Sequence, residues 1–212
     1  MILRTYKGKT LKIYYKDEYI IVCEKDAGFL SEGEGKDCMP YVLAQEFIAN
    51  GEKSDIFTVH RLDRETSGIM VYARTKESAA ALSRAITDGS FEKEYIAEVH
   101  GFPDDSCGRL EDLLFYDRTK NRSYTVKRMR KGVKDAYLEY TVVSSENGIT
   151  TVRVKLLTGR THQIRVQFAS RKMPLVGDRK YGAPDTKRPL SLRACRLSFP
   201  HPKTNEIMKF ED

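Results

Sequence analysis

The feature that most constrains the fold is a strand-like segment, residues 59–73, whose middle is charged. Both ends are apolar and β-branched, which is typical of a buried strand. The middle reads His60-Arg61-Leu62-Asp63-Arg64-Glu65-Thr66-Ser67-Gly68. Asp, Thr, Ser and Gly favour a turn. Flanking arginines favour the ionised form of a carboxylate, which can serve as a nucleophile or a base. The segment therefore predicts either a simple turn or a reactive carboxylate at Asp63.

Composition predicts a globular protein with an anionic partner. The 212 residues are 40% hydrophobic and 32% charged, which suffices for a sizeable core. With no internal repeat or linker, we expect a single domain over residues 1–212. The net charge of +7 and the pI near 9.1 favour nucleic acid as the partner.

Localisation follows from what the sequence lacks. No apolar run reaches the roughly 20 residues that span a bilayer. Residues 1–6 lack the apolar centre of a signal peptide, so we expect a cytoplasmic protein with no membrane contact. The four cysteines form no CxxC pair, which predicts free thiols and no metal site.

Apolar periodicity, capping residues and turn residues predict where helices, a strand and a hairpin lie. An apolar stripe predicts a helix over residues 40–49, and a second helix should begin after Thr75 and end at Gly89. Alternation over residues 94–100 predicts a strand that carries Tyr95 on the same face as Ala97 and Val99. Asn147-Gly148 predicts a hairpin turn. The Gly-rich residues 28–35 lack the GK[ST] ending of a phosphate loop.

Two basic segments are candidates for RNA contact. Residues 118–134, the basic ribbon, hold eight Lys or Arg and no acidic residue, which favours an exposed loop or edge ribbon. Phosphate contact and a merely solvated loop are both open for it. Farther on, Thr161 should cap a helix, and Arg160, His162 and Arg165 at its start predict an anion site.

Four motifs in order resemble the RluA family of RNA pseudouridine synthases. They are His60–Gly68, Lys93-Glu94-Tyr95, Leu157–Val166 and Gly177-Asp178-Arg179-Lys180-Tyr181-Gly182. The resemblance covers about residues 13–210. It departs at Asp26, where the family often has proline, and at Gln167, where it often has histidine. Many relatives carry an N-terminal S4 domain, and we expect none here.

The resemblance implies an α+β fold: a mixed, mainly antiparallel sheet with peripheral helices and a central cleft. It implies isomerisation of uridine to pseudouridine in rRNA or tRNA, without cofactor or metal, by a monomer. Asp63 would be the essential aspartate, Tyr95 the aromatic beside the target uracil, and Arg165 the partner of the aspartate. We expect substrate contacts from other residues of the motifs: His60, Arg61, Arg64, Arg160, His162, Gln163, Asp178 and Tyr181. Among these, Arg61 would fill the gap left by the flipped base.

The residues leave the chemical route open. Asp63 could stabilise the cationic sugar, add to it, or remove the C2′ proton. A hydrolytic glycosidase would need a second carboxylate, for which Glu65 is the nearest candidate. The alternative from another class is a non-catalytic RNA-binding module that acts in RNA folding or ribosome assembly. Because Asp63, Tyr95 and Arg165 are all present, the sequence favours the enzyme.

Overall fold

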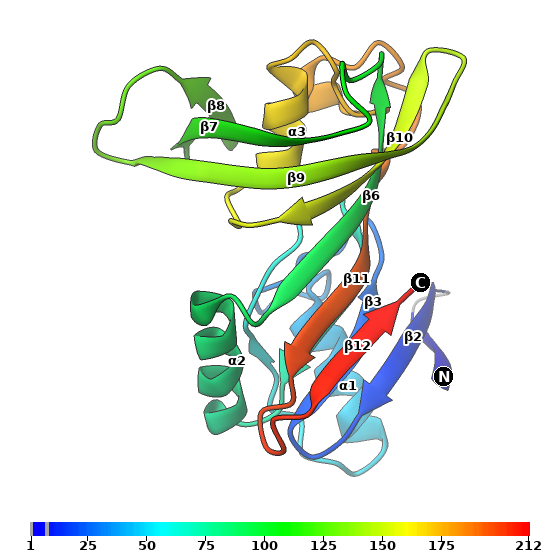
Figure 1. The fold of residues 1–212 in the computed structure, drawn as a ribbon. Coiled ribbons are helices and arrows are strands. Elements are labelled where there is room, and N and C mark those ends of the chain that lie inside the picture. The colour runs from blue at the N-terminus through cyan, green and yellow to red at the C-terminus, as the bar shows by residue number, and fades with distance from the viewer. Residues whose placement is uncertain (1, 7–8) are drawn as a thin grey trace. The chain divides into compact units, whose positions relative to one another are not determined.

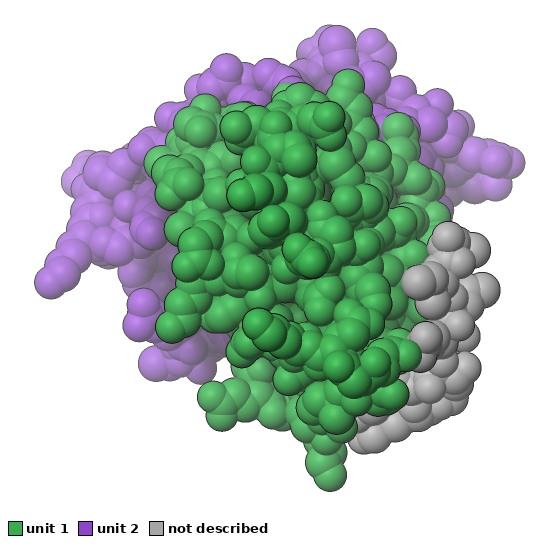
Figure 2. Space-filling view, turned by 90° about the horizontal axis from the view of Figure 1, so that it is seen from below, with its two compact units in different colours: residues 1–93, 194–212 green, residues 94–193 purple. Residues whose placement is uncertain are grey.

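The computed structural model describes residues 2–6 and 9–212. The chain divides into two compact units, residues 1–93 with 194–212, and residues 94–193 (Figure 2). It leaves the first unit within strand β6 (Glu92–His100) and returns within strand β11 (Leu192–Pro200). Both units consist mainly of antiparallel strands with few helices, which confirms the predicted α+β class.

The strands of the first unit follow the order β1-β2-β3-β5-β11, with β4 paired to β5 and β12 paired to β11 (Figure 1). Their bounds are β1 Ile2–Tyr6, β2 Lys9–Lys16, β3 Ile20–Lys25, β4 Phe57–Thr58, β5 Ser67–Ala73 and β12 Ile207–Glu211. Strands β3 and β5 pair from Ile20 with Ala73 to Lys25 with Gly68. This register brings the end of β3 next to the charged motif that precedes β5.

Two helices accompany the sheet of the first unit. Helix α1 (Met39–Ala49) has a proline in its first turn, and helix α2 (Lys76–Asp88) buries Leu82 and Ala85. The Thr75 hydroxyl accepts a hydrogen bond from the Ser78 N–H at 3.1 Å, which caps α2 as predicted. Gly89 ends it in the left-handed conformation, with φ of 84°. Both predicted helices are therefore confirmed.

The core of the first unit lies between β3, β5, α2 and β11. It contains Ile20, Val22, Ile69, Val71, Ala73, Leu82, Ala85, Phe91, Leu197 and Phe199. The two apolar ends of residues 59–73 thus adopt different structures. Residues 67–73 form the buried strand β5, whereas the first end at Val59 lies in the loop that follows the short strand β4, so the strand expected there is not formed.

The strands of the second unit follow the order β6-β10-β9-β7-β8 (Figure 1). The bounds are β7 Cys107–Asp117, β8 Arg122–Val126, β9 Val133–Glu146 and β10 Ile149–Leu156. The predicted hairpin joins β9 to β10, and both turn residues are left-handed, with φ of 52° at Asn147 and 77° at Gly148. In β6 the buried residues alternate, so Tyr95 shares a face with Ala97 and Val99 as predicted.

Helix α3 (Gln163–Ala169) and the short 3-10 helix η1 (Arg179–Tyr181) pack against this second group of strands. Leu114 of β7, Ala136 of β9, Val166 of α3 and Tyr181 form their common apolar cluster. Helix α3 is short and almost wholly buried. Its polar side chains must therefore find partners inside the unit.

Candidate functional site

Asp63 lies in a turn between β4 and β5. Its carbonyl oxygen accepts a hydrogen bond from the Thr66 N–H at 3.0 Å, and its side chain is partly buried. Gly68 follows with φ of 125°, and an added Cβ there would lie 2.3 Å from the carbonyl oxygen of Ala194 in β11. Only glycine therefore permits β5 to begin this close to β11. The turn predicted from the polar residues is confirmed.

Both backbone neighbours of Asp63 are hydrogen-bonded to the segment that follows β3. The Ser31 hydroxyl accepts from the Leu62 N–H at 2.9 Å and donates to the Leu62 carbonyl oxygen at 2.8 Å. The Arg64 carbonyl oxygen accepts from the Gly28 N–H at 2.7 Å and from the Lys25 ammonium at 3.2 Å. Lys25 is fully buried and also donates to the Phe29 carbonyl oxygen. The candidate carboxylate therefore stands on a backbone that is anchored on both sides.

The two arginines beside Asp63 form exposed ion pairs. Arg61 contacts Glu32 at 2.6 Å, with side chains 62% and 55% exposed. Arg64 contacts Asp37 at 2.9 Å, with side chains 57% and 52% exposed. Pairs this exposed are weak because water and salt screen them. Both guanidinium groups can therefore exchange a carboxylate for a phosphate at little cost.

His60 is buried, although the motif predicted it as a substrate contact. Its Nε2 accepts a hydrogen bond from the Val71 N–H at 3.1 Å, which places the proton of the neutral ring on Nδ1. Burial, and secondarily the charge of Lys93, hold the pKa of His60 well below its usual value. The ring also packs against Phe91, with centroids 5.1 Å apart. Through these contacts the neutral His60 ring supports β5.

The predicted anion site at the start of α3 has an internal partner. Arg165 donates through Nε to Asp178 Oδ2 and through Nη2 to Asp178 Oδ1, both at 2.7 Å. The side chains are 2% and 0% exposed. Asp178 Oδ1 also accepts from the Tyr181 N–H at 3.2 Å. A buried carboxylate of the same unit is thus one partner of this arginine, and the anion site at the start of α3 stays a prediction.

The start of α3 also differs from the prediction that Thr161 caps it. The residue before the helix is His162, which is left-handed with φ of 55° and provides no side-chain cap. Instead, the Gln163 Oε1 atom accepts from the Arg160 N–H at 3.0 Å and from the Thr158 hydroxyl at 2.8 Å. Arg160 Nε donates to the Asp135 carbonyl oxygen at 2.8 Å. Arg160 and Gln163 thus fasten this loop to the unit.

Tyr181 connects η1 to β8. Its hydroxyl accepts from the Ser123 N–H at 2.9 Å and lies 3.2 Å from the Ser123 carbonyl oxygen and 3.0 Å from His162 Nδ1. Burial raises the pKa of Tyr181 to about 12, so the hydroxyl keeps its proton at neutral pH. Ser123 lies within the basic ribbon. The contacts of Tyr181 therefore anchor the strand of that ribbon, β8.

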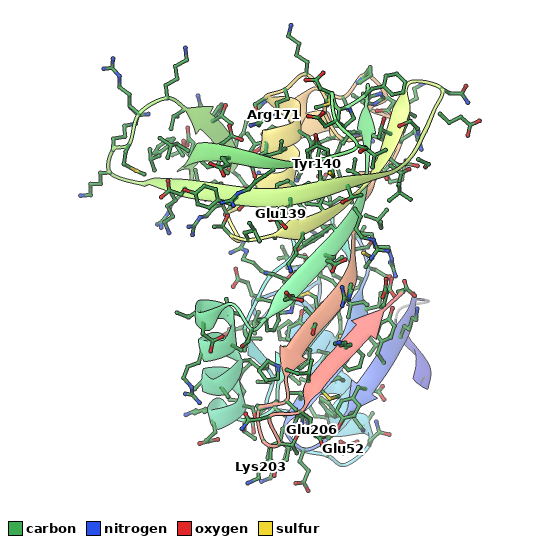
Figure 3. The ribbon with its side chains drawn as sticks, viewed as in Figure 1. Glu52, Glu139, Tyr140, Arg171, Lys203 and Glu206 are labelled. Carbon is green, nitrogen blue, oxygen red and sulfur yellow. The ribbon has the colours of Figure 1, made fainter. Side chains whose placement is uncertain are left out.

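The basic ribbon has the exposed position that the sequence predicted. Strand β8 lies at one end of the strand order and pairs only with β7 among the described strands. Residues 127–132, which follow it, are exposed. Long side chains with nitrogen ends project from the loop between β8 and β9 (Figure 3). Lys127, Arg128 and Lys131 form no ion pair with any described residue.

The three predicted catalytic residues are divided between the units. Asp63 belongs to the first, whereas Tyr95 and Arg165 belong to the second. Tyr95 lies opposite Val154 in the pairing of β6 with β10, and its side chain is 4% exposed. The pairing of Arg165 with Asp63 and the stacking of Tyr95 on uracil stay predictions.

Several supporting residues escaped the sequence reasoning: Lys25, Ser31, Glu32 and Asp37. All lie in or beside the Gly-rich segment after β3, which had been assessed only as a phosphate loop. The available signal was its density of polar residues next to a strand end. Within residues 2–6 and 9–212, no group of three His, Cys, Asp or Glu side chains is arranged to hold a metal ion. No helix in the same residues has the length and apolar character of a membrane span.

Comparison with known proteins identifies the family. Residues 19–170 match the model of the RNA pseudouridylate synthase family. The chain is 33% identical to the dual-specificity RNA pseudouridine synthase RluA of Escherichia coli, over 95% of this chain and 92% of that protein. It is 34% identical to an uncharacterised RNA pseudouridine synthase of Mycoplasma pneumoniae, over 95% of this chain and 66% of the relative.

Solved structures agree on the fold. The human RNA pseudouridylate synthase domain containing 4 matches with a TM-score of 0.78 and 24% identity, over 95% of this chain and 87% of that one. The human RNA pseudouridylate synthase domain containing 1 matches with a TM-score of 0.78 and 23% identity, over 95% and 82% of the two chains. The chain belongs to the RNA pseudouridylate synthase family, which confirms the resemblance to the RluA family.

Proposed function

We propose that the chain isomerises specific uridines to pseudouridine in a structured stem-loop of rRNA or tRNA, with Asp63 as the essential carboxylate. One observation carries the proposal. Asp63 stands on an anchored turn between two exposed arginines, in a chain of this family. An anchored carboxylate can stabilise a developing charge without reorganising, and the arginines can bind phosphates on either side of it.

The reaction needs no second carboxylate. The C1′–N1 bond breaks, the uracil turns, and a C1′–C5 bond forms. The proton on C5 leaves and N1 takes up a proton, so neither water nor an oxidant is consumed. Asp63 acts on the sugar during bond breaking, by one of the three routes given above. This distinguishes the reaction from glycoside hydrolysis, in which two carboxyl groups flank the scissile bond.

Other residues have supporting roles in the proposal. The target base must leave its stack, which costs a few kcal/mol. The Tyr95 ring stacks on the flipped uracil, worth about 1–3 kcal/mol by analogy with other base–aromatic contacts. Arg165, aimed by Asp178, offers a guanidinium group to Asp63, and Arg61 fills the gap in the RNA. Arg64 and the basic ribbon bind phosphates.

We also propose that both units belong to one catalytic domain that acts as a monomer on cytoplasmic RNA. The supporting observation is that the chain passes between the units twice, within β6 and within β11. Each of these strands contributes residues to both units, so a cut at either boundary would interrupt a strand.

The test is Asp63→Asn, with Glu65→Gln as the matched control. Both variants replace a carboxylate with an amide in the same turn. Release of tritium from RNA labelled at C5 of uridine measures turnover. Loss of a positioned reactive group typically costs about 10²–10⁴-fold, so Asp63→Asn should lose at least that much, while RNA affinity persists. Glu65→Gln should keep the rate.

Three outcomes would overturn parts of the proposal. Turnover by Asp63→Asn near that of the unaltered chain would exclude Asp63 as the catalytic group. Equal losses in both variants would show that Asp63 is not the single essential carboxylate of the turn. RNA binding by the unaltered chain without tritium release, on RNA from cells that lack this protein, would favour the non-catalytic RNA-binding module.

A further inference from the structure

The Ser31 hydroxyl has an unusual role: it satisfies both backbone groups of a single residue. It accepts from the Leu62 N–H at 2.9 Å and donates to the Leu62 carbonyl oxygen at 2.8 Å. Ser31 and Leu62 are both buried, at 3% and 5% exposure. Buried backbone groups require partners, and strand neighbours normally supply them. Here one side chain replaces a neighbouring strand at the residue before Asp63.

Ser31 is itself attached to the strands on both sides of the turn. Its carbonyl oxygen accepts from the Thr58 hydroxyl of β4 at 3.3 Å and from the Tyr72 hydroxyl of β5 at 3.1 Å. Tyr72 is fully buried, so its hydroxyl has a fixed position. Ser31 therefore links the backbone of Leu62, through its hydroxyl, to β4 and β5, through its carbonyl oxygen.

The opposite side of Asp63 has separate supports. Lys25 and Gly28 both donate to the Arg64 carbonyl oxygen, at 3.2 Å and 2.7 Å. Loss of Ser31 would thus leave the turn attached at Arg64 and released at Leu62. We expect the Asp63 side chain to change its orientation, because only the Arg64 side of its backbone stays fixed. The fold itself should persist.

We propose that Ser31 is a positioning residue that orients Asp63 through the backbone of Leu62. The proposal rests on the proposed function, because it assigns Ser31 a role through the Asp63 carboxylate. Ser31 touches no reacting atom in this role. Misplacement of a reacting group by about 1 Å can cost about a hundredfold in rate. The rate of the chemical step should therefore respond to Ser31 while RNA affinity does not.

The experiment compares Ser31→Ala with Ser78→Ala in single-turnover tritium release and RNA binding. Ser78 is also 3% exposed, and its hydroxyl accepts from Thr75 Oγ1 at 2.9 Å at the start of α2. Measurements are made below the melting temperature of each variant. Ser31→Ala should lower the single-turnover rate by about ten- to a hundredfold, with RNA affinity within about twofold. Ser78→Ala should keep the rate even if its melting temperature falls equally.

Two further variants keep the test informative if Ser31→Ala folds poorly. Tyr72→Phe removes only the hydroxyl that holds the Ser31 carbonyl and should slow turnover in the same direction by a smaller factor. Ser31→Thr keeps a hydroxyl and should recover part of the rate lost in Ser31→Ala. A full rate in a folded Ser31→Ala variant would overturn the proposal, as would equal rate losses in Ser31→Ala and Ser78→Ala; if Ser31→Ala does not fold, a full rate in Tyr72→Phe would overturn it.

Failure of this inference is distinguishable from failure of the proposed function. If the unaltered chain releases tritium and Asp63→Asn does not, the proposed function stands whatever Ser31→Ala does. Under that result, a full rate in Ser31→Ala contradicts only the positioning role. If the unaltered chain releases no tritium from any RNA tested, the proposed function itself fails.

Discussion

Arg165 of the second unit and Arg61 of the first form ion pairs in opposite environments. In the second unit, Arg165 and Asp178 form two hydrogen bonds of 2.7 Å with almost no exposed surface. In the first unit, Arg61 lies 2.6 Å from Glu32 with more than half of each side chain exposed. The distances are similar, yet the environments differ. A buried pair is costly to break because the remaining charge is left without water, whereas an exposed pair separates easily.

The difference indicates what each arginine can do. Arg165 has one geometry, set by a planar carboxylate and by the contact of Asp178 with Tyr181. It is suited to orient a group inside the protein. Arg61 can separate from Glu32 and contact either a phosphate or the gap that a flipped base leaves in the RNA. Contact with RNA therefore suits Arg61, and internal support suits Arg165.

The largest effect should come from breaking the buried pair. Asp178→Asn removes the carboxylate charge that faces Arg165 inside the unit, and breaking a buried pair typically costs about 3–5 kcal/mol. Glu32→Gln makes the same chemical change in the exposed pair and should cost about 0–1 kcal/mol. Urea unfolding of both variants measures the free energy of unfolding. Equal losses of unfolding free energy in the two variants would show that burial does not make the Arg165–Asp178 pair more important for stability than the Arg61–Glu32 pair.

An intermediate effect is expected from the exposed cations of the basic ribbon, which form no ion pair with a described residue. Replacing Lys127, Arg128, Arg130 and Lys131 with glutamine should reduce the slope of log affinity against log salt by up to about one unit per lost phosphate contact. A control changes four exposed cations of the first unit together: Lys76, Arg84, Lys203 and Lys209. Filter binding across a salt series measures the slope.

The control determines how the salt series is interpreted. Both quadruple variants lose the same net charge, so a general effect of charge would alter their slopes equally. A slope that falls only in the variant of the basic ribbon would support phosphate contacts there. An unchanged slope would identify residues 127–131 as a solvated loop.

The smallest effect concerns the exposed pair itself. Glu32→Gln should tighten RNA binding at low salt by about two- to fivefold, because Arg61 no longer has to leave a carboxylate. Glu34→Gln is the matched control: it removes the same charge from the same loop, and Glu34 forms no ion pair with a described residue. Equal gains of RNA affinity in both variants would show that the change of net charge alone causes the effect. That result would contradict competition between Glu32 and RNA for Arg61.

The sequence alone was sufficient for part of the local structure. Thr75 and Gly89 bound α2 because capping depends on residues within one turn. Asn147 and Gly148 formed the predicted hairpin because both tolerate left-handed backbone. The family and the exposure of the basic ribbon also followed from motifs and charge. These features depend on neighbours in the chain.

Tertiary structure alone decided which side chains support the candidate site. Thr161 was predicted as a cap, but the Gln163 side chain accepts from the Arg160 N–H instead. Arg165 contacts the buried carboxylate of Asp178, 13 residues away, which no motif predicted. Ser31 contacts Leu62 across 31 residues. No pattern of period or spacing records such pairs, because burial makes each polar group bond whatever the fold brings near it.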